Sequence, residues 1–293
     1  MRITNSIIRD NAVAGLQSNL RAINTAQAQV SSGLRIARTS DDPAGSASVM
    51  HAGGSLRALD QYKKNITTAS TRVSAEETAV NSLNDVLTRA KELATSQASD
   101  TANAGSRASA KTEVDALMAQ AIQLGNTKFG DEYLFGGVQS QTAPFDPTQP
   151  GFSAAAPTGE RLVEASANQL LKSTHNGAQV FLDSGALAAL KQLSDALGTD
   201  DTSQISASMA NIDSSFASVQ DVLGEIGARS NQLQVTNSNL DALKINLQTF
   251  KSDLQDVDLE KAVTELVSRQ TAYQAAMLAT SRVMGMTLTD YLR

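Results

Sequence analysis

The sequence predicts a mainly α protein, an elongated antiparallel coiled-coil or helical rod formed by both chain ends, with a small β-rich or mixed insert. Three observations predict it. Apolar residues recur at alternating three- and four-residue steps near the start, as in the a and d positions of coiled coils. The same rhythm returns near the end. The middle of the chain instead collects most of the prolines and phenylalanines.

The composition favours seams between helices over a thick globular core. Of the 293 residues, 41% are hydrophobic, but only 4% are aromatic and there is no tryptophan. Small aliphatic side chains suit helix–helix seams. The net charge is −6 and no long Lys/Arg run occurs. A nucleic-acid partner and an anionic membrane surface are therefore not expected.

Targeting and cross-linking signals are missing from the sequence. There is no cysteine, so disulfides and thiolate metal sites are excluded. The N-terminal residues lack the apolar stretch and cleavage pattern of a Sec-type signal. No run of 18 apolar residues occurs, so no membrane insertion is expected. If the protein is exported, we expect another route.

The first helix is predicted over about residues 6–32. Gly33 suits the left-handed cap at its end. After a short link, Asp42 can cap a new helix and Pro43 suits its first turn. The seam of the first helix comprises Val13, Leu16, Leu20, Ile23, Gln27, Val30 and Leu34.

The second helix is predicted to reach about Ala98. One heptad series is Leu59, Ile66, Val73, Val80 and Leu87. Three positions after each come Tyr62, Ala69, Glu76, Leu83 and Ala90, with Glu76 as the polar exception. A loop at about 100–105 precedes a third helix that ends near Gly125 and Asn126.

The region from about 137 to 198 is predicted to be the insert. Turn residues there separate short apolar runs, and 179–182 (Gln-Val-Phe-Leu) is predicted to be a strand. Helical periodicity resumes with Leu187, Leu190, Leu193 and Leu197. It breaks at 198–201 and then restarts.

The last long helix carries the clearest ladder. Leu233, Leu240, Leu247 and Leu254 recur every seven residues, paired with Thr236, Leu243, Phe250 and Val257. The register then fails, because the next seam position is Lys261. Asp258 can cap a fresh helix, whose seam is Val263, Leu266, Gln270, Tyr273, Met277, Thr280 and Met284. We expect this joint and the break at 33–43 to lie side by side.

The elements combine into three predicted parts. Residues 1–42 and 257–293 form a terminal coiled-coil assembly domain. Residues 43–136 and 199–256 form a helical rod domain, and 137–198 form a variable, surface-exposed, β-rich insert. A lone two-helix pair buries too little to offset the entropy lost on ordering it. We therefore expect other subunits to complete an assembly interface made of Leu16, Leu20, Ile23, Val30, Leu266, Tyr273, Met277 and Leu288.

No constellation in the sequence predicts catalysis, a cofactor or a metal. His51 and His175 have no partner at ligand spacing, and both are expected to be solvent-exposed or locally bonded. The adjacent carboxylates 41–42, 76–77 and 200–201 fit capping or solvation better than acid–base work. Residues 136–137 (Gly-Gly) predict a tight turn. The chain is not expected to be an enzyme.

Two separated motifs carry a resemblance to a known family. SSGLRI at 31–36, followed by SDDPAG at 40–45, resembles the N-terminal signature of bacterial flagellins and their hook-associated relatives. GARSNQL at 227–233 is similar to the matching C-terminal helix. The resemblance covers about 1–136 and 200–293. Four segments resemble the hook-associated relatives more than flagellin: MRI (1–3), Pro43, YLFGG (133–137) and MTLTDYL (286–292). The final Arg293 instead resembles the end of flagellins.

The resemblance implies a structural subunit of the bacterial flagellum, an adaptor at the hook–filament junction. It implies extracellular localisation after unfolded export through the flagellar type III channel, escorted by an export chaperone. The implied partners are further copies in a homo-oligomeric ring, the first hook-associated protein and flagellin. Two alternatives remain: a minor flagellin, and a cell-surface binding module acting through residues 137–198.

Overall fold

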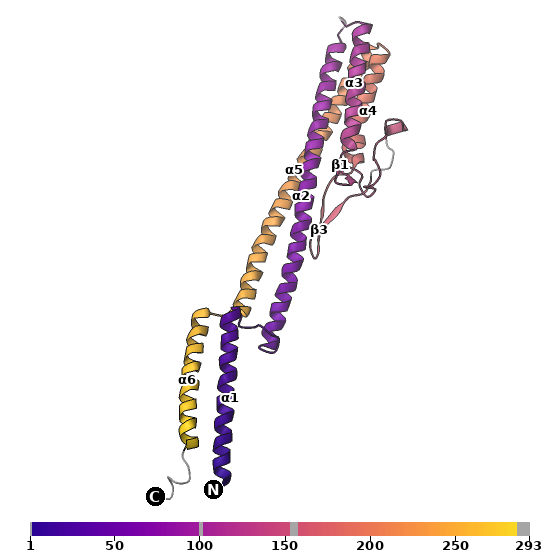
Figure 1. Ribbon diagram of the computed structural model, residues 1–293. Coiled ribbons are helices and arrows are strands. Elements are labelled where there is room, and N and C mark those ends of the chain that lie inside the picture. The colour runs from indigo at the N-terminus through magenta and orange to yellow at the C-terminus, as the bar shows by residue number, and fades with distance from the viewer. Residues whose placement is uncertain (1, 100–101, 153–157, 286–293) are drawn as a thin grey trace. The chain divides into compact units, whose positions relative to one another are not determined.

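The computed structural model describes residues 2–99, 102–152 and 158–285 (Figure 1). It is 76% helical, with long helices from both chain ends and only small antiparallel sheets, which confirms the mainly α prediction. The α-helices of the described residues are α1 (Arg2–Ser32), α2 (Pro43–Gln97), α3 (Ala104–Gly125), α4 (Ala186–Gly198), α5 (Thr202–Gln255) and α6 (Leu259–Gly285).

The chain divides into two compact units. The terminal unit contains Met1–Ala58 and Leu243–Arg293, and the central unit contains Leu59–Ala242. Both divisions fall inside long helices, α2 and α5. The three domains, with boundaries at 42/43, 136/137, 198/199 and 256/257, remain a prediction.

The helix ends of the terminal unit follow local capping chemistry, as predicted. Gly33 ends α1 at a φ of +71°, a left-handed conformation that glycine adopts without steric cost. Asp42 accepts a hydrogen bond from the N–H of Gly45 at 2.9 Å and so caps α2. Asp258 accepts from the N–H of Lys261 at 3.2 Å and caps α6.

The two breaks lie side by side, which confirms their predicted pairing. The N–H of Val257 donates to the oxygen of Gly33 at 2.9 Å, and the N–H of Arg35 donates to the oxygen of Gln255 at 2.7 Å. Leu34 and Asp256 form an antiparallel bridge between these bonds. Because α6 begins beside the end of α1, the two helices run antiparallel (Figure 1).

In the central unit α2 and α5 also run antiparallel. Lys63 pairs with Asp241 near one end, and Lys91 pairs with Asp213 near the other. An ion pair between Arg89 and Glu113 joins α2 to α3. Almost every position in the two heptad series of α2 from Leu59 to Ala90 is buried, since partners cover it on more than one side.

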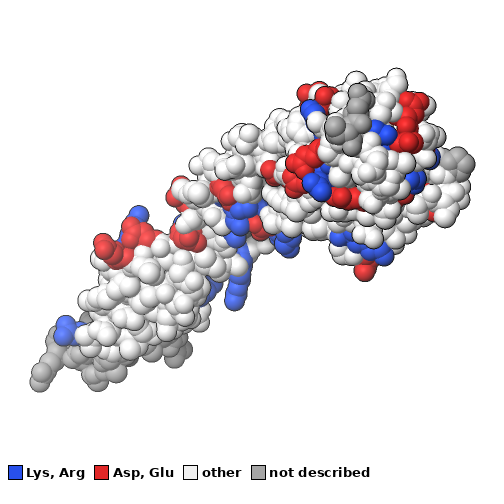
Figure 2. Space-filling model, turned by 90° about the horizontal axis from the view of Figure 1, so that it is seen from above, with Lys and Arg blue, Asp and Glu red and all other residues white. Residues whose placement is uncertain are grey.

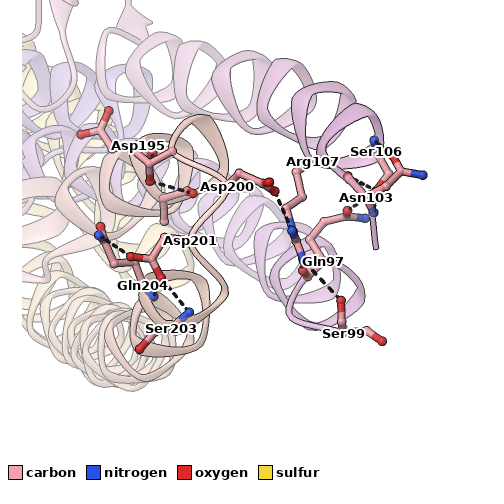
Figure 3. Close-up of polar contacts among 12 residues, drawn as sticks. Gln97, Ser99, Asn103, Ser106, Arg107, Asp195, Asp200, Asp201, Ser203 and Gln204 are labelled. Atoms are coloured by element: carbon pink, nitrogen blue, oxygen red, sulfur yellow. Dashed lines mark hydrogen bonds and ion pairs between the residues drawn. The ribbon is translucent and has the colours of Figure 1, made fainter. Parts of the chain in front are cut away.

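A buried arginine closes the tip of the central unit (Figure 3). The Arg107 guanidinium donates to the oxygens of Gln97 (3.2 Å) and Ser99 (3.3 Å) and to a carboxylate oxygen of Asp200 (2.5 Å). It thereby joins the end of α2, the start of α3 and the link between α4 and α5. Asp201 caps α5, as the paired carboxylates predicted, by accepting from the N–H groups of Ser203 and Gln204.

The insert is mixed rather than a small sheet. Its hairpin pairs β3 (Leu162–Ser166) with β4 (Gln169–Lys172), and a shorter pair, β1 (Lys128–Phe129) with β2 (Glu132–Tyr133), precedes it. The turn predicted at 136–137 is present, with Gly137 at a φ of +59°.

The strand predicted at 179–182 is wrong, because these residues lie in a π-helical turn, Ala178–Asp183. Asn176 accepts from the N–H of Gln179 at 3.0 Å and so starts the turn. The Phe181 ring then packs against the rings of Phe135 and Phe145, at centroid distances of 5.1 and 5.2 Å. A four-residue apolar run has no distinctive period, so sequence pattern could not separate the two conformations.

Candidate assembly surface

The α1–α6 pair buries only one of the two apolar columns on α1. We call the column that faces α6 the inner column, and on α1 it consists of Leu16, Ile23 and Val30, which are buried or half-buried. The other column, here called the outer column, consists of Val13, Leu20 and Gln27, all exposed to solvent.

The same division occurs on α6. Its inner column, Leu266, Tyr273 and Thr280, is half-buried, and its outer column, Val263, Gln270 and Met277, is exposed. The four large apolar side chains of the two outer columns are 41% to 49% exposed. Both helices of the pair therefore present an unfilled half of a coiled-coil seam.

The predicted interface residues divide between these columns. Leu16, Ile23, Val30, Leu266 and Tyr273 lie in the inner columns, whereas Leu20 and Met277 lie in the outer columns. Leu288 lies outside the described residues. The structure thus separates residues that pair the chain's own ends from residues that remain exposed to solvent.

Sequence reasoning treated both columns alike and missed this division. A column becomes buried only when a helix has a neighbour on that side, and the number of neighbours is not encoded in the spacing of one helix. One local signal was available, since Gln27 and Gln270 both fall in the outer columns. An amide tolerates solvent on a monomer better than a leucine does.

The terminal unit carries further exposed apolar side chains outside the two outer columns. Ile7, Leu259, Val267 and Leu278 are each more than half exposed, and on α5 Leu243 and Phe250 are nearly so. Exposed apolar patches of this kind mark interaction surfaces in soluble proteins.

Each helix of the pair contains a long stretch without charge. No charged residue occurs in α1 after Arg21, and none occurs in α6 between Arg269 and Arg282. On the face shown in Figure 2, acidic and basic side chains are interspersed and separated by wide uncharged stretches. Depletion of charge is typical of interface cores.

The described residues show no arrangement that predicts catalysis. They contain no group of three His, Asp or Glu side chains that could hold a metal, and none of their helices is long and apolar enough to span a bilayer. A groove of about 530 Å³ between the β3–β4 hairpin and α5 is lined by small, apolar and amide side chains such as Gln169, Asn231 and Asn239. It has no titratable group for acid–base chemistry.

The two histidines differ in environment. His51 is exposed to solvent, which was one of the two environments predicted for it. His175 is buried and bonded to Glu76, 99 residues away, so its bonding is not local. Glu76 is fully buried, and its predicted capping or solvated role is wrong.

Comparison with known proteins identifies the family. The model of the bacterial flagellin N-terminal helical region matches residues 3–140, and that of the C-terminal helical region matches residues 209–292. The chain belongs to the bacterial flagellin family. Both columns of the α1–α6 pair lie within the matched residues, so this flagellin-family chain carries its candidate surface in the part that defines the family.

The individual relatives include both hook-associated proteins and flagellins. The flagellin-family chain is 27% identical to flagellar hook-associated protein 3 of Escherichia coli, over 93% of this chain and 96% of that protein. It is 28% identical to the flagellin of Bacillus subtilis, over the full length of both. The crystal structure of FlgL from Bacillus cereus superposes with a TM-score of 0.60 at 19% identity, covering 69% of this chain and 99% of that one. This superposition shows a shared fold.

Proposed function

We propose that this chain is a structural, non-enzymatic subunit of the bacterial flagellum that acts as an adaptor at the hook–filament junction and polymerises through its terminal helices. The exposed outer columns of α1 and α6 support the assembly part of this proposal. They leave the apolar side chains Val13, Leu20, Val263 and Met277 in water on the isolated chain. Burial of one such side chain contributes about 1.5–3 kcal/mol, and contact with further copies would supply it.

The proposed assembly divides the work between the columns. The inner columns hold α1 against α6 within one copy. The outer columns of neighbouring copies pack against one another, with the side chains of one helix inserted between those of the next, as in multi-stranded coiled coils. Residues 1–42 and 257–293 then form the assembly domain, with Leu288 as a further contact.

The proposed partners follow from the junction role. Copies form a homo-oligomeric ring that contacts the first hook-associated protein on one side and flagellin on the other. The chain reaches this extracellular place unfolded through the flagellar type III export channel, escorted by an export chaperone. The relatives named as hook-associated proteins support this placement.

A minor flagellin is the second candidate. The full-length similarity to the Bacillus subtilis flagellin favours it. The chain is 28% identical to that flagellin and 27% identical to the hook-associated protein of Escherichia coli. A filament subunit would use the same outer columns, because flagellins contain both matched helical regions. The surface therefore supports assembly under either role, and a cellular experiment must separate them.

Deletion of the gene tests the placement. Cells without a junction adaptor should keep their hooks, lose their filaments and release filament subunits into the medium, because nothing then attaches the filament to the hook. Electron microscopy and immunoblots of the medium measure both results. Filaments that persist at normal density on the deleted cells would instead indicate a minor flagellin.

Complementation tests the surface. The double variant Leu20→Glu, Met277→Glu should be secreted but should not restore filaments, because each outer column then carries a charge that assembly would bury. Leu170→Glu is the matched control, since Leu170 is exposed on the insert and outside the terminal helices. Filament restoration by the double variant would overturn the assigned surface.

A further inference from the structure

One buried imidazole links the insert to two helices. His175 follows the β3–β4 hairpin and is only 4% exposed. Its Nδ1 lies 2.6 Å from Oε1 of Glu76 on α2, and its Nε2 lies 2.9 Å from Oε2 of Glu225 on α5. The backbone N–H of His175 donates to the same Glu76 oxygen at 2.9 Å.

This geometry fits the protonated ring. An imidazolium has an N–H on both nitrogens and can donate to both carboxylates, whereas neutral imidazole has one N–H and can donate to one. Glu76 is fully buried, and its Oε2 has no hydrogen-bond partner within the described structure. A buried carboxylate needs a nearby positive charge, and His175 lies against it.

Other charges face this cluster from each neighbouring element. On α5, Arg229 lies 3.3 and 3.4 Å from the two ring nitrogens of His175, where its charge opposes protonation. The positive charge of Lys172 on β4 helps to lower the pKa of Glu225. On α2, one turn before Glu76, Arg72 is committed to an ion pair with Glu132.

We propose that His175 is a proton-operated latch, which fastens the insert to α2 and α5 while both ring nitrogens carry hydrogen and loosens as the solution becomes alkaline. On loss of the proton, one nitrogen presents a lone pair to a carboxylate, which repels it. The attachment to α5 through Glu225 is then lost.

The titration of the group agrees in direction. Burial by itself lowers the pKa of His175, but hydrogen bonds to Glu76 and Glu225 outweigh it and raise the pKa above the ordinary 6.5. Because this pKa is higher in the folded than in the unfolded chain, the latch stabilises fully below about pH 6.5. The stabilisation is lost as the pH rises through the folded-state pKa.

Proton NMR of the full chain tests the protonation directly. In a His51→Gln background, His175 is the one remaining histidine, so its ring signals need no further assignment. We expect its titration midpoint above about 6.5, and a lower midpoint in Glu225→Gln, whose exposed side chain can change without loss of the fold. A midpoint at or below 6.5, or one unaffected by Glu225→Gln, would overturn the latch.

Thiol labelling tests the opening. The natural chain has no cysteine, and Ser173 is buried with a hydroxyl that has no hydrogen-bond partner, so Ser173→Cys is a mild local reporter. Its labelling rate is compared with and without His175→Gln at each pH, so that the pH dependence of the thiol cancels in the ratio. His175→Gln should accelerate labelling several-fold at pH 6, where the imidazolium holds both carboxylates, and the ratio should fall toward one as the pH rises and the imidazole loses its proton.

A second reporter separates the latch from general unfolding. Ser208→Cys lies on α5, buried near the tip of the central unit, about 25 Å along the helix from Glu225. Its labelling should not change with His175→Gln at any pH. A Ser173→Cys ratio that is constant with pH, or an equal acceleration at Ser208→Cys, would show that His175 acts only as a structural residue.

Discussion

At the scale of single residues, the central unit depends on a few charged side chains that join segments distant in the sequence. Arg107 donates to three segments at the tip, and its guanidinium is almost fully buried. Glu132, on β2, accepts from Arg72 of α2 and from Arg161 just before β3. Such groups differ from exposed ion pairs because water replaces their hydrogen bonds less completely when one of the side chains is truncated.

The first prediction concerns Arg107. Arg107→Met should lower the free energy of unfolding of the central unit by about 1–3 kcal/mol, since it removes three hydrogen bonds made by a buried guanidinium, while water can reach the half-exposed Asp200 carboxylate. Urea titration followed by circular dichroism measures this loss. Arg89→Met is the control, because Arg89 is half exposed and solvent screens its ion pairs with Glu92 and Glu113, so a much smaller loss is expected. Equal losses in the two variants would contradict the assigned role.

The second prediction concerns acid. Hydrogen bonds from Arg161 and Arg72 lower the pKa of Glu132 from 4.5 to about 2. The carboxylate therefore stabilises the fold above about pH 4.5, and this contribution falls as the pH drops toward 2. Glu132→Gln should lower the urea midpoint at pH 6, and the gap from the natural chain should narrow steadily below pH 4.5. A gap that stays constant to pH 3 would argue against the shifted carboxylate.

At the scale of elements, a helix buries as many apolar columns as it has neighbours. Both heptad series of α2 are buried in the central unit, whereas α1 and α6 each bury one. Their helical propensity and spacing are alike, so packing partners make the difference.

The third prediction contrasts two leucines on one helix. Leu16→Ala removes an inner-column contact and should destabilise the α1–α6 pair by about 1–3 kcal/mol. Leu20→Ala lies one turn away in the outer column and should change it by less than about 0.5 kcal/mol. Hydrogen exchange of α1 amides in the monomer measures both effects. A larger loss from Leu20→Ala would reverse the assigned columns.

The element ends were predictable because their signals are local. Gly33, the Asp42–Pro43 pair and Asp258 each act on a neighbouring turn, and each lies at the predicted boundary. The candidate surface was only partly predictable, because the sequence marks apolar positions but not which ones a second helix covers. The His175–Glu76 contact was missed since two residues 99 positions apart carry no common pattern.

At the scale of the whole molecule, the terminal and central units differ in how complete their cores are. The central unit contains most of the fully buried large side chains, including Phe135, Leu83 and Leu190. In the terminal unit the apolar seam of α1 and α6 is half filled. Local opening should therefore be far more frequent in the terminal helices than in the central unit.

The fourth prediction follows for the dilute monomer. Brief trypsin treatment should remove α1 and α6, at sites such as Arg38 and Lys261, and leave a helical fragment that contains the central unit. Mass spectrometry identifies the cut sites. Incorporation into an assembly should protect the same bonds, because neighbouring copies fill the outer columns. A monomer whose two ends resist cleavage as well as its centre does would contradict the half-filled seam.

The two glutamines have a consequence for fidelity. Gln27 follows Val13 and Leu20 at heptad spacing, and Gln270 lies between Val263 and Met277. If the glutamines of neighbouring copies face each other in the proposed assembly, a copy docked one heptad out of step would set an amide against aliphatic side chains and leave its N–H and C=O groups without hydrogen bonds. Mis-stacked neighbours would therefore dissociate faster than correctly aligned ones. Two polar side chains per chain would therefore select the correct register in the assembly, while the apolar side chains around them supply most of the binding energy.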